Sequence, residues 1–136
     1  MTADGTSAKL FLSYSRDVAV FAQAVAAGLE ERGFVAWTDR GFPHGGDFDE
    51  RLRRELDHSE LVVVFVSSET PRSPNVNFEI GAALAQGKLV LPIYLSEAAS
   101  RGASGLLRRT QGIEAYTLTP AEVADKIAGA VDAAAA

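Results

Sequence analysis

The fold is decided by one run of six apolar residues, Leu61-Val62-Val63-Val64-Phe65-Val66. The run is far shorter than the roughly 20 residues that a membrane-spanning helix needs, and it has the length of a β-strand. A strand that is apolar at every position is expected to be buried on both faces, as at the centre of a parallel sheet. This run therefore predicts the central strand of an α/β domain.

Shorter apolar runs and helical patterns alternate on both sides of this strand. Further strands are predicted at Lys9–Ser13, Phe34–Thr38 and Leu89–Leu95, with an edge strand at Ile113–Leu118. Apolar residues at helical spacing predict helices over Val18–Leu29, Phe48–Leu56 and Val76–Gln86, and after Thr119. The stretch Ser96–Gly112 carries the weakest signal, one helical turn and a loop. Such alternation predicts a flavodoxin-like α/β fold, a doubly wound five-stranded parallel sheet with helices on both faces.

Capping residues predict where these helices begin and end. Gly33 is placed to stop the first helix. Ser73 and Pro74 have the pattern of an N-cap followed by a first-turn proline, although Asn75 is a second candidate for the cap. Thr119-Pro120-Ala121-Glu122 is a capping box that opens the last helix, which is expected to bury Val123, Ile127 and Val131.

The pattern also predicts which side chains point inward. Ile80, Ala83 and Leu84 are expected on the buried side of the third helix. The second helix is expected to turn Arg51, Arg53, Arg54 and Glu55 outward, and the Gly-rich stretch Asp39–Asp47 is predicted to be a loop. Pro92 predicts that part of its strand is exposed or ends early, because proline cannot donate to a sheet.

Length and charge limit the kind of protein. The 136 residues fit one domain, and we expect tails at 1–8 and 133–136 around a domain at 9–132. Thirteen basic and eighteen acidic residues give 13 − 18 = −5. An acidic domain is not expected to bind nucleic acid directly, since neutralising phosphates takes a basic surface.

Few residues are available for metal or thiol chemistry. The chain has no cysteine, which excludes thiol nucleophiles, disulfides and zinc ribbons, and its only histidines are His44 and His58. We therefore expect no metal and no bound cofactor. The polar start MTADGTSA lacks the features of a signal peptide. These observations predict a cytoplasmic protein with no membrane contact.

The fold class predicts where a ligand would bind. In a doubly wound sheet the ligand crevice lies beyond the carboxyl ends of the strands. The loops that meet there begin near Ser13, Asp39, Ser67 and Ser96. No GxGxxG motif or P-loop is present, so an ordinary dinucleotide-binding or nucleotide-hydrolysing site is poorly supported.

Four segments, in order, resemble the TIR (Toll/interleukin-1 receptor) domain family, with a bacterial-type pattern. Phe11-Leu12-Ser13-Tyr14-Ser15-Arg16-Asp17 resembles the family's first box, and Gly33–Asp39 followed by Gly46-Asp47-Phe48 is similar to its second strand and BB loop. Ser67-Ser68 followed by Ser73–Leu84 resembles the segment that carries the catalytic glutamate of TIR enzymes. Gly87–Ile93 continues the match.

The resemblance implies an enzyme that cleaves the nicotinamide–ribose bond of NAD⁺, with ADP-ribose or a cyclised ADP-ribose as product. Glu79 falls on the catalytic glutamate. The expected substrate-binding residues are Ser13, Tyr14, Ser15, Arg16, Trp37, Asp39 and Asn75. The family commonly has tryptophan four residues before the glutamate, so Asn75 predicts a different pocket wall. NAD⁺ is here a substrate and not a cofactor.

The residues themselves fit this chemistry. Breaking an N-glycosidic bond builds positive charge on the ribose, which a carboxylate can stabilise. Nicotinamide leaves as a neutral amine, so no general acid is needed and one carboxylate suffices. Arg16 is placed to pair with the pyrophosphate. Glu79 is expected early in its helix, where the helix dipole favours the ionised form.

The resemblance also implies partners and an alternative function. Family enzymes work as self-associated TIR arrays in defence or signalling, with a fused or separate sensor domain. A non-catalytic adaptor acting through homotypic TIR–TIR binding is the alternative, and a nucleoside-processing relative is a weaker one. Individual residues have structural interpretations as well: Glu79 as a surface residue of its helix, Arg16 as a solvated loop charge, and Trp37 as packing beneath the second helix.

Overall fold

The computed structural model describes residues 8–38, 46–103, 107 and 112–135, with the backbone alone at 46–49 and at 134 and 135. Its elements, in order, are β1 (Lys9–Ser13), η1 (Arg16–Val18), α1 (Ala19–Glu31), β2 (Val35–Trp37), α2 (Gly46–His58), β3 (Leu61–Val66), η2 (Thr70–Arg72), α3 (Pro74–Ala85), β4 (Val90–Tyr94), α4 (Glu97–Arg101), β5 (Ile113–Glu114) and α6 (Pro120–Ala135).

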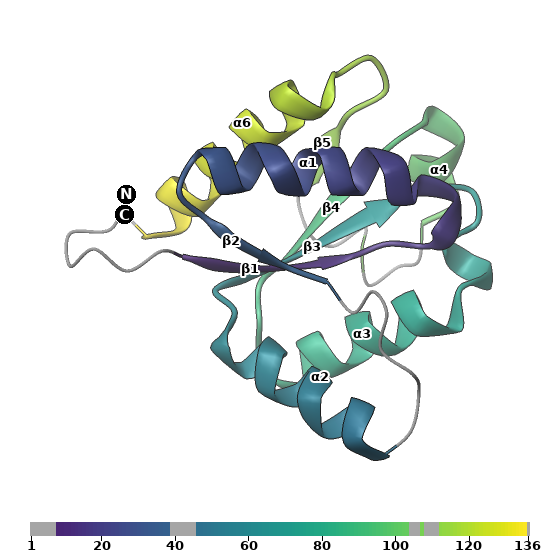
Figure 1. Ribbon diagram of the computed structural model, residues 1–136. Coiled ribbons are helices and arrows are strands. Elements are labelled where there is room, and N and C mark those ends of the chain that lie inside the picture. Colours follow the sequence, from purple (N-terminus) through teal and green to yellow (C-terminus); the bar gives the residue numbers. More distant parts are fainter. Residues whose placement is uncertain (1–7, 39–45, 104–106, 108–111, 136) are drawn as a thin grey trace.

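The described strands form one five-stranded sheet in the order β2-β1-β3-β4-β5, and every neighbouring pair is parallel. Helices α1 and α6 cover one face of this sheet, and α2 and α3 cover the other (Figure 1). The predicted flavodoxin-like α/β fold is confirmed. Because all strands run the same way, the loops after β1 and β3 leave the sheet at the same edge.

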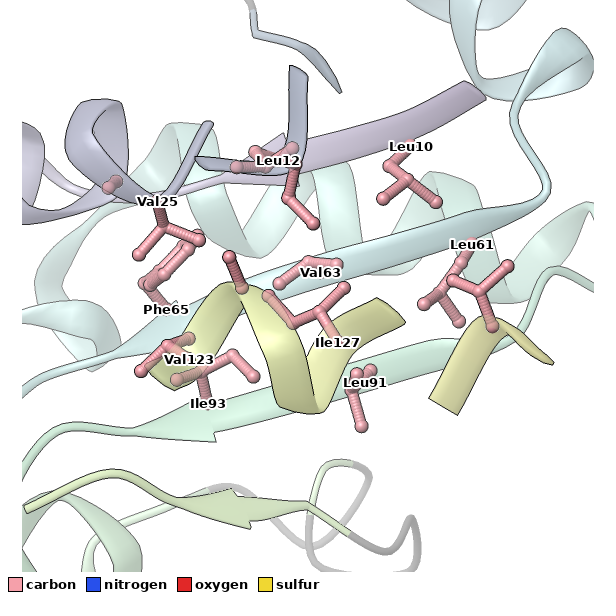
Figure 2. Packing of buried hydrophobic residues seen from close by; sticks show 14 of the residues in the cluster. Leu10, Leu12, Val25, Leu61, Val63, Phe65, Leu91, Ile93, Val123 and Ile127 are labelled. Carbon is pink, nitrogen blue, oxygen red and sulfur yellow. The ribbon is translucent and has the colours of Figure 1, made fainter. Parts of the chain in front are cut away.

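The core lies in two layers, one on each side of the sheet. All six residues of β3 are buried. Leu61, Val63 and Phe65 pack under α1 and α6 together with Val25 and Ile127 (Figure 2). The alternate residues of β3 pack under α2 and α3, with Leu52, Leu56 and Ile80. The prediction of a central strand buried on both faces is confirmed, and it explains why no polar position interrupts this run.

Several predicted helix ends are confirmed. Gly33 follows α1 with a φ of 89°, a left-handed conformation that suits glycine. The Ser73 hydroxyl accepts a hydrogen bond from the Val76 amide at 3.4 Å, with Pro74 as the first residue of α3. In the capping box, Thr119 N–H donates to Glu122 Oε1 at 2.8 Å, and Glu122 N–H donates to Thr119 Oγ1 at 3.2 Å.

Other boundaries differ from the expectation. Helix α2 begins at Gly46, so the end of the predicted loop Asp39–Asp47 is helical. Glu55 does not point freely outward but forms an ion pair with Lys9 of β1. Ala8, expected in a tail, is buried and its carbonyl accepts from the Val35 amide, which extends the β1–β2 contact. At the other end, α6 continues to Ala135 rather than stopping before 133.

Two predictions about which residues are exposed were wrong. Leu84 is 38% exposed, because the buried side of α3 is formed by Val76, Glu79, Ile80 and Ala83, and Leu84 lies off that stripe. Pro92 is buried within β4, which neither ends early nor lies exposed. The missing N–H of Pro92 is tolerated because the pairing of β4 with β5 begins only at Ile93.

Close approach of the chain to Pro92 makes Gly112 a sensitive position. A Cβ at Gly112 would lie 2.6 Å from Tyr94 Cε2 and 2.8 Å from the Pro92 carbonyl oxygen. We expect Gly112→Ala to lower the free energy of unfolding by about 1–3 kcal/mol through overpacking against fixed backbone. Gly129→Ala is the control, because nothing lies within 4 Å of that Cβ in α6 and alanine favours the helix. Urea denaturation of both variants checks this, and equal midpoints would contradict it.

Candidate active site

The candidate site is centred on Glu79, a carboxylate on the buried side of α3. Its side chain is 2% exposed, unusual for glutamate. The structural interpretation of Glu79 as a surface residue is therefore wrong. Because α3 begins at Pro74, Glu79 lies in the second turn, beyond the first turn where the helix dipole acts most strongly. Nearby side chains, rather than the dipole, are what hold this carboxylate.

Ser13 is the side chain that meets Glu79 across the α2–α3 face of the sheet. It is the last residue of β1 and lies two residues after Phe11, so the two side chains point to the same face of the sheet, where Phe11 packs. Ser13 Oγ donates to Glu79 Oε1 at 2.5 Å, and Ser13 itself is 1% exposed. The hydrogen bond joins two residues that are far apart in sequence. The sheet therefore brings together two of the predicted site residues at the carboxyl end of β1.

The remaining predicted residues surround this pair unequally. Trp37 lies on the same face of the sheet, half-buried, with its ring centroid 4.9 Å from that of Phe11. Tyr14 instead packs toward the α1–α6 core, with its ring centroid 6.3 Å from that of Phe65 in an edge-to-face arrangement. The Tyr14 ring therefore packs on the face of the sheet opposite Glu79. Its assignment as a substrate contact stays a prediction.

Three further predicted residues are polar and lie near the same edge. Ser15 is buried, and its hydroxyl donates to Asp17. Arg16 is exposed at the start of η1, and Asn75 is exposed one helical turn before Glu79 on α3. Asp39 lies outside the described residues. Substrate contacts for these four residues remain predictions.

A family match covers most of the chain. The model of the TIR domain family matches residues 10–128, which is more than half of the sequence. The chain belongs to the TIR domain family. This match contains Ser13, α3 and Glu79, so the Ser13–Glu79 pair lies inside the region that matches. Among curated protein sequences, none matches this TIR domain.

Solved structures share the fold of this TIR domain at low identity. The TIR domain of the Toll-related receptor TRR-2 from Hydra magnipapillata aligns with a TM-score of 0.65 and 14% identity, over 76% of this chain and 81% of that one. The CMP N-glycosidase BcmB from Clostridium botulinum aligns at 0.66 and 19%, over 90% and 98%. A TIR-STING receptor from C. gigas aligns at 0.71 and 20%, over 96% of this chain and 42% of that one.

Two polar residues near the site, Asp17 and Ser67, were not among the predicted site residues. Asp17 accepts from the hydroxyls of Ser15 and Ser67, the latter at 2.7 Å, and so joins the loops after β1 and β3. Asp17 lies in the motif that resembles the first TIR box, but nothing in the spacing shows that it contacts Ser67. The usable signal is that both residues lie in loops that were predicted to meet beyond the carboxyl ends of the strands.

The helices of this TIR domain are short or amphipathic. In the described part of the chain, none combines the length and apolar character required to cross a lipid bilayer.

Proposed function

We propose that this TIR domain cleaves the nicotinamide–ribose bond of NAD⁺, with Glu79 as the catalytic carboxylate, and that self-assembly activates it in a defence or signalling role. The observation that carries the proposal is the buried Glu79–Ser13 pair at the carboxyl ends of the strands. Burying a carboxylate costs free energy, and such a cost at the edge where this fold class binds ligands supports a functional role for Glu79.

The proposed reaction needs one carboxylate and no metal. The bond between the nicotinamide nitrogen and ribose C1′ breaks, and its electron pair leaves with neutral nicotinamide. Glu79 stabilises the positive charge that develops on the ribose. Water then adds at C1′ and releases a proton to give ADP-ribose, or an adenine nitrogen adds there to give a cyclised product.

One structural neighbour supports N-glycosidic chemistry on this fold. BcmB, which aligns over 90% of this chain, is described as a CMP N-glycosidase. Cleaving CMP and cleaving NAD⁺ both break a bond between ribose C1′ and a ring nitrogen. Because the two substrates differ in leaving group, a test of this TIR domain should include both nucleotides.

Burial of Glu79 supports a requirement for activation. At 2% exposure the carboxylate does not reach a solvent-borne ribose in the conformation described. We assign the opening of the site to TIR–TIR assembly, in which a neighbouring chain displaces the residues that cover Glu79. The isolated domain should accordingly be weakly active, and its activity should rise steeply with concentration.

The same burial favours the alternative, a non-catalytic adaptor that acts through homotypic TIR–TIR binding. The likeness to TRR-2 and to the TIR-STING receptor is compatible with it. An adaptor would keep Glu79 covered in the assembled state as well. The two functions therefore differ in one observable, nucleotide cleavage by the assembled protein.

The decisive experiment measures nucleotide cleavage by the assembled protein. Nicotinamide release from NAD⁺ and cytosine release from CMP are measured while the protein concentration rises from micromolar to millimolar, with light scattering to record assembly. We expect nicotinamide release from the wild type, rising with assembly, and none above background from Glu79→Ala. An assembled wild type that leaves NAD⁺ intact would support the adaptor, and cytosine release alone would make CMP the substrate.

A further inference from the structure

A chain of hydrogen bonds leads from the loop after β1, through the loop after β3, to α3, the helix that carries Glu79. It begins at Ser15, whose hydroxyl donates to Asp17 Oδ1, and Ser67 Oγ donates to the other oxygen of Asp17 at 2.7 Å. Ser67 N–H donates to Thr70 Oγ1 at 2.8 Å. Asn77 Nδ2 then donates to the Thr70 carbonyl at 3.2 Å. We call these five residues the Asp17 relay.

The two ends of the relay are close in sequence to the two site residues. Ser15 is two residues after Ser13, and Asn77 is two residues before Glu79. The direct Ser13–Glu79 bond and the Asp17 relay therefore form two separate connections between the β1 loop and α3. A carboxylate held through both connections has less freedom to move away from the end of β1 than one held by a single hydroxyl.

Three members of the relay are buried, and the other two, Asp17 and Asn77, are exposed. Ser15, Ser67 and Thr70 are all at most 8% exposed. Each loop is closed by its own turn, with Val18 N–H donating to the Ser15 carbonyl at 3.1 Å and Thr70 N–H to that of Ser67 at 3.2 Å. Asn77 also donates to the Ser73 carbonyl at 2.8 Å, which fixes η2 against the first turn of α3. Asp17 is the member that joins the two loops.

We propose that Asp17 is a positioning residue: through the relay it sets α3, and with it Glu79, relative to Ser13. The proposal rests on the function proposed above for Glu79. Asp17 itself does not contact the reacting atoms. A misplacement of reacting groups by about 1 Å can lower a rate about 100-fold, so a partial loss of order at Glu79 should lower kcat measurably.

The test compares variants that differ in the bonds they retain. Asp17→Ala removes both acceptors, whereas Asp17→Asn keeps an oxygen for one hydroxyl and an amide that donates to the other. We expect Asp17→Ala to lower the kcat of nicotinamide release about tenfold with KM within about twofold. Asp17→Asn should recover most of the kcat. Asp132→Ala, an exposed aspartate on α6, is the matched control.

Thermal unfolding of every variant separates positioning from loss of fold. An Asp17→Ala protein with wild-type kcat but a lower Tm would overturn the proposal, and so would Asp17→Asn being as slow as Asp17→Ala while both are folded. A wild type no more active than Glu79→Ala would mean instead that the proposed function fails.

A second measurement tests the relay without an activity assay. Asp17→Ala, Asn77→Ala and the double variant form a cycle in the free energy of unfolding, together with amide exchange of α3. If the relay connects the two residues, the double variant loses less than the sum of the single losses, and Asp17→Ala speeds exchange around Glu79. If the losses of unfolding free energy are additive and amide exchange around Glu79 is unchanged, the relay does not connect the two residues and the proposal is overturned.

Discussion

Replacing Glu79 by glutamine is expected to lower the kcat of nicotinamide release about 100- to 1000-fold, or more, in the assembled protein. Glutamine has nearly the same size as glutamate, and its carbonyl can still accept from Ser13 Oγ, which lies 2.5 Å from the carboxylate in the wild type. What it lacks is the negative charge that stabilises the developing charge on the ribose. The loss should therefore fall on kcat and not on the fold.

Glu60→Gln is the control for this substitution. Glu60 is exposed directly before β3, at the amino ends of the strands and so at the opposite edge of the sheet from Glu79. Single-turnover measurements at saturating NAD⁺ should show wild-type rates for Glu60→Gln. A Glu79→Gln protein that assembles and cleaves at the wild-type rate would remove Glu79 from the mechanism, even if the domain proved to be an enzyme.

The largest expected effect on stability comes from Phe65→Ala, about 3–5 kcal/mol of unfolding free energy. Phe65 is fully buried in β3, and the edges of Tyr14 and Phe21 pack against it at centroid distances of 6.3 Å. Truncation leaves a cavity in the α1–α6 core that these neighbours cannot fill. Since domains are stable by only about 5–15 kcal/mol, the variant should be close to unfolding at 37 °C.

Phe78→Ala is the control for Phe65→Ala, because it removes the same atoms from a side chain that is 48% exposed on α3. It should change the free energy of unfolding by no more than about 0.5 kcal/mol. Urea titrations followed by circular dichroism measure both. Similar losses in the two variants would mean that the buried ring contributes no more than a surface ring.

Much of the fold could be predicted because the deciding signals are local. The bounds of β3 follow from an uninterrupted apolar run, and the starts of α3 and α6 follow from caps formed within four residues. Leu84 was misplaced for one reason: the buried stripe of α3 includes a glutamate, which an apolar pattern does not count. The burial of Pro92 was not predicted, because a proline is tolerated inside β4 only if pairing with β5 begins after it, and β5 is distant in sequence.

The candidate site was less accessible to sequence reasoning. Glu79 was located by its family motif, and its burial could not be foreseen from composition or spacing. The Ser13–Glu79 bond and the contact of Asp17 with Ser67 join residues that are far apart along the chain. Polar contacts of this kind produce no periodic pattern in the sequence. They depend on the register of β1 against β3, which only the assembled sheet defines.

The central strand has a consequence for how this protein must be produced. Six consecutive residues of high β-propensity, without charge or proline, are the pattern of segments that stack into cross-β aggregates. In the folded sheet β1 and β4 pair with both edges of Leu61–Val66, but β4 is complete only once Tyr94 has been added. Fragments cut before Tyr94 leave one edge of this strand open, so we expect them to aggregate more readily than the whole chain.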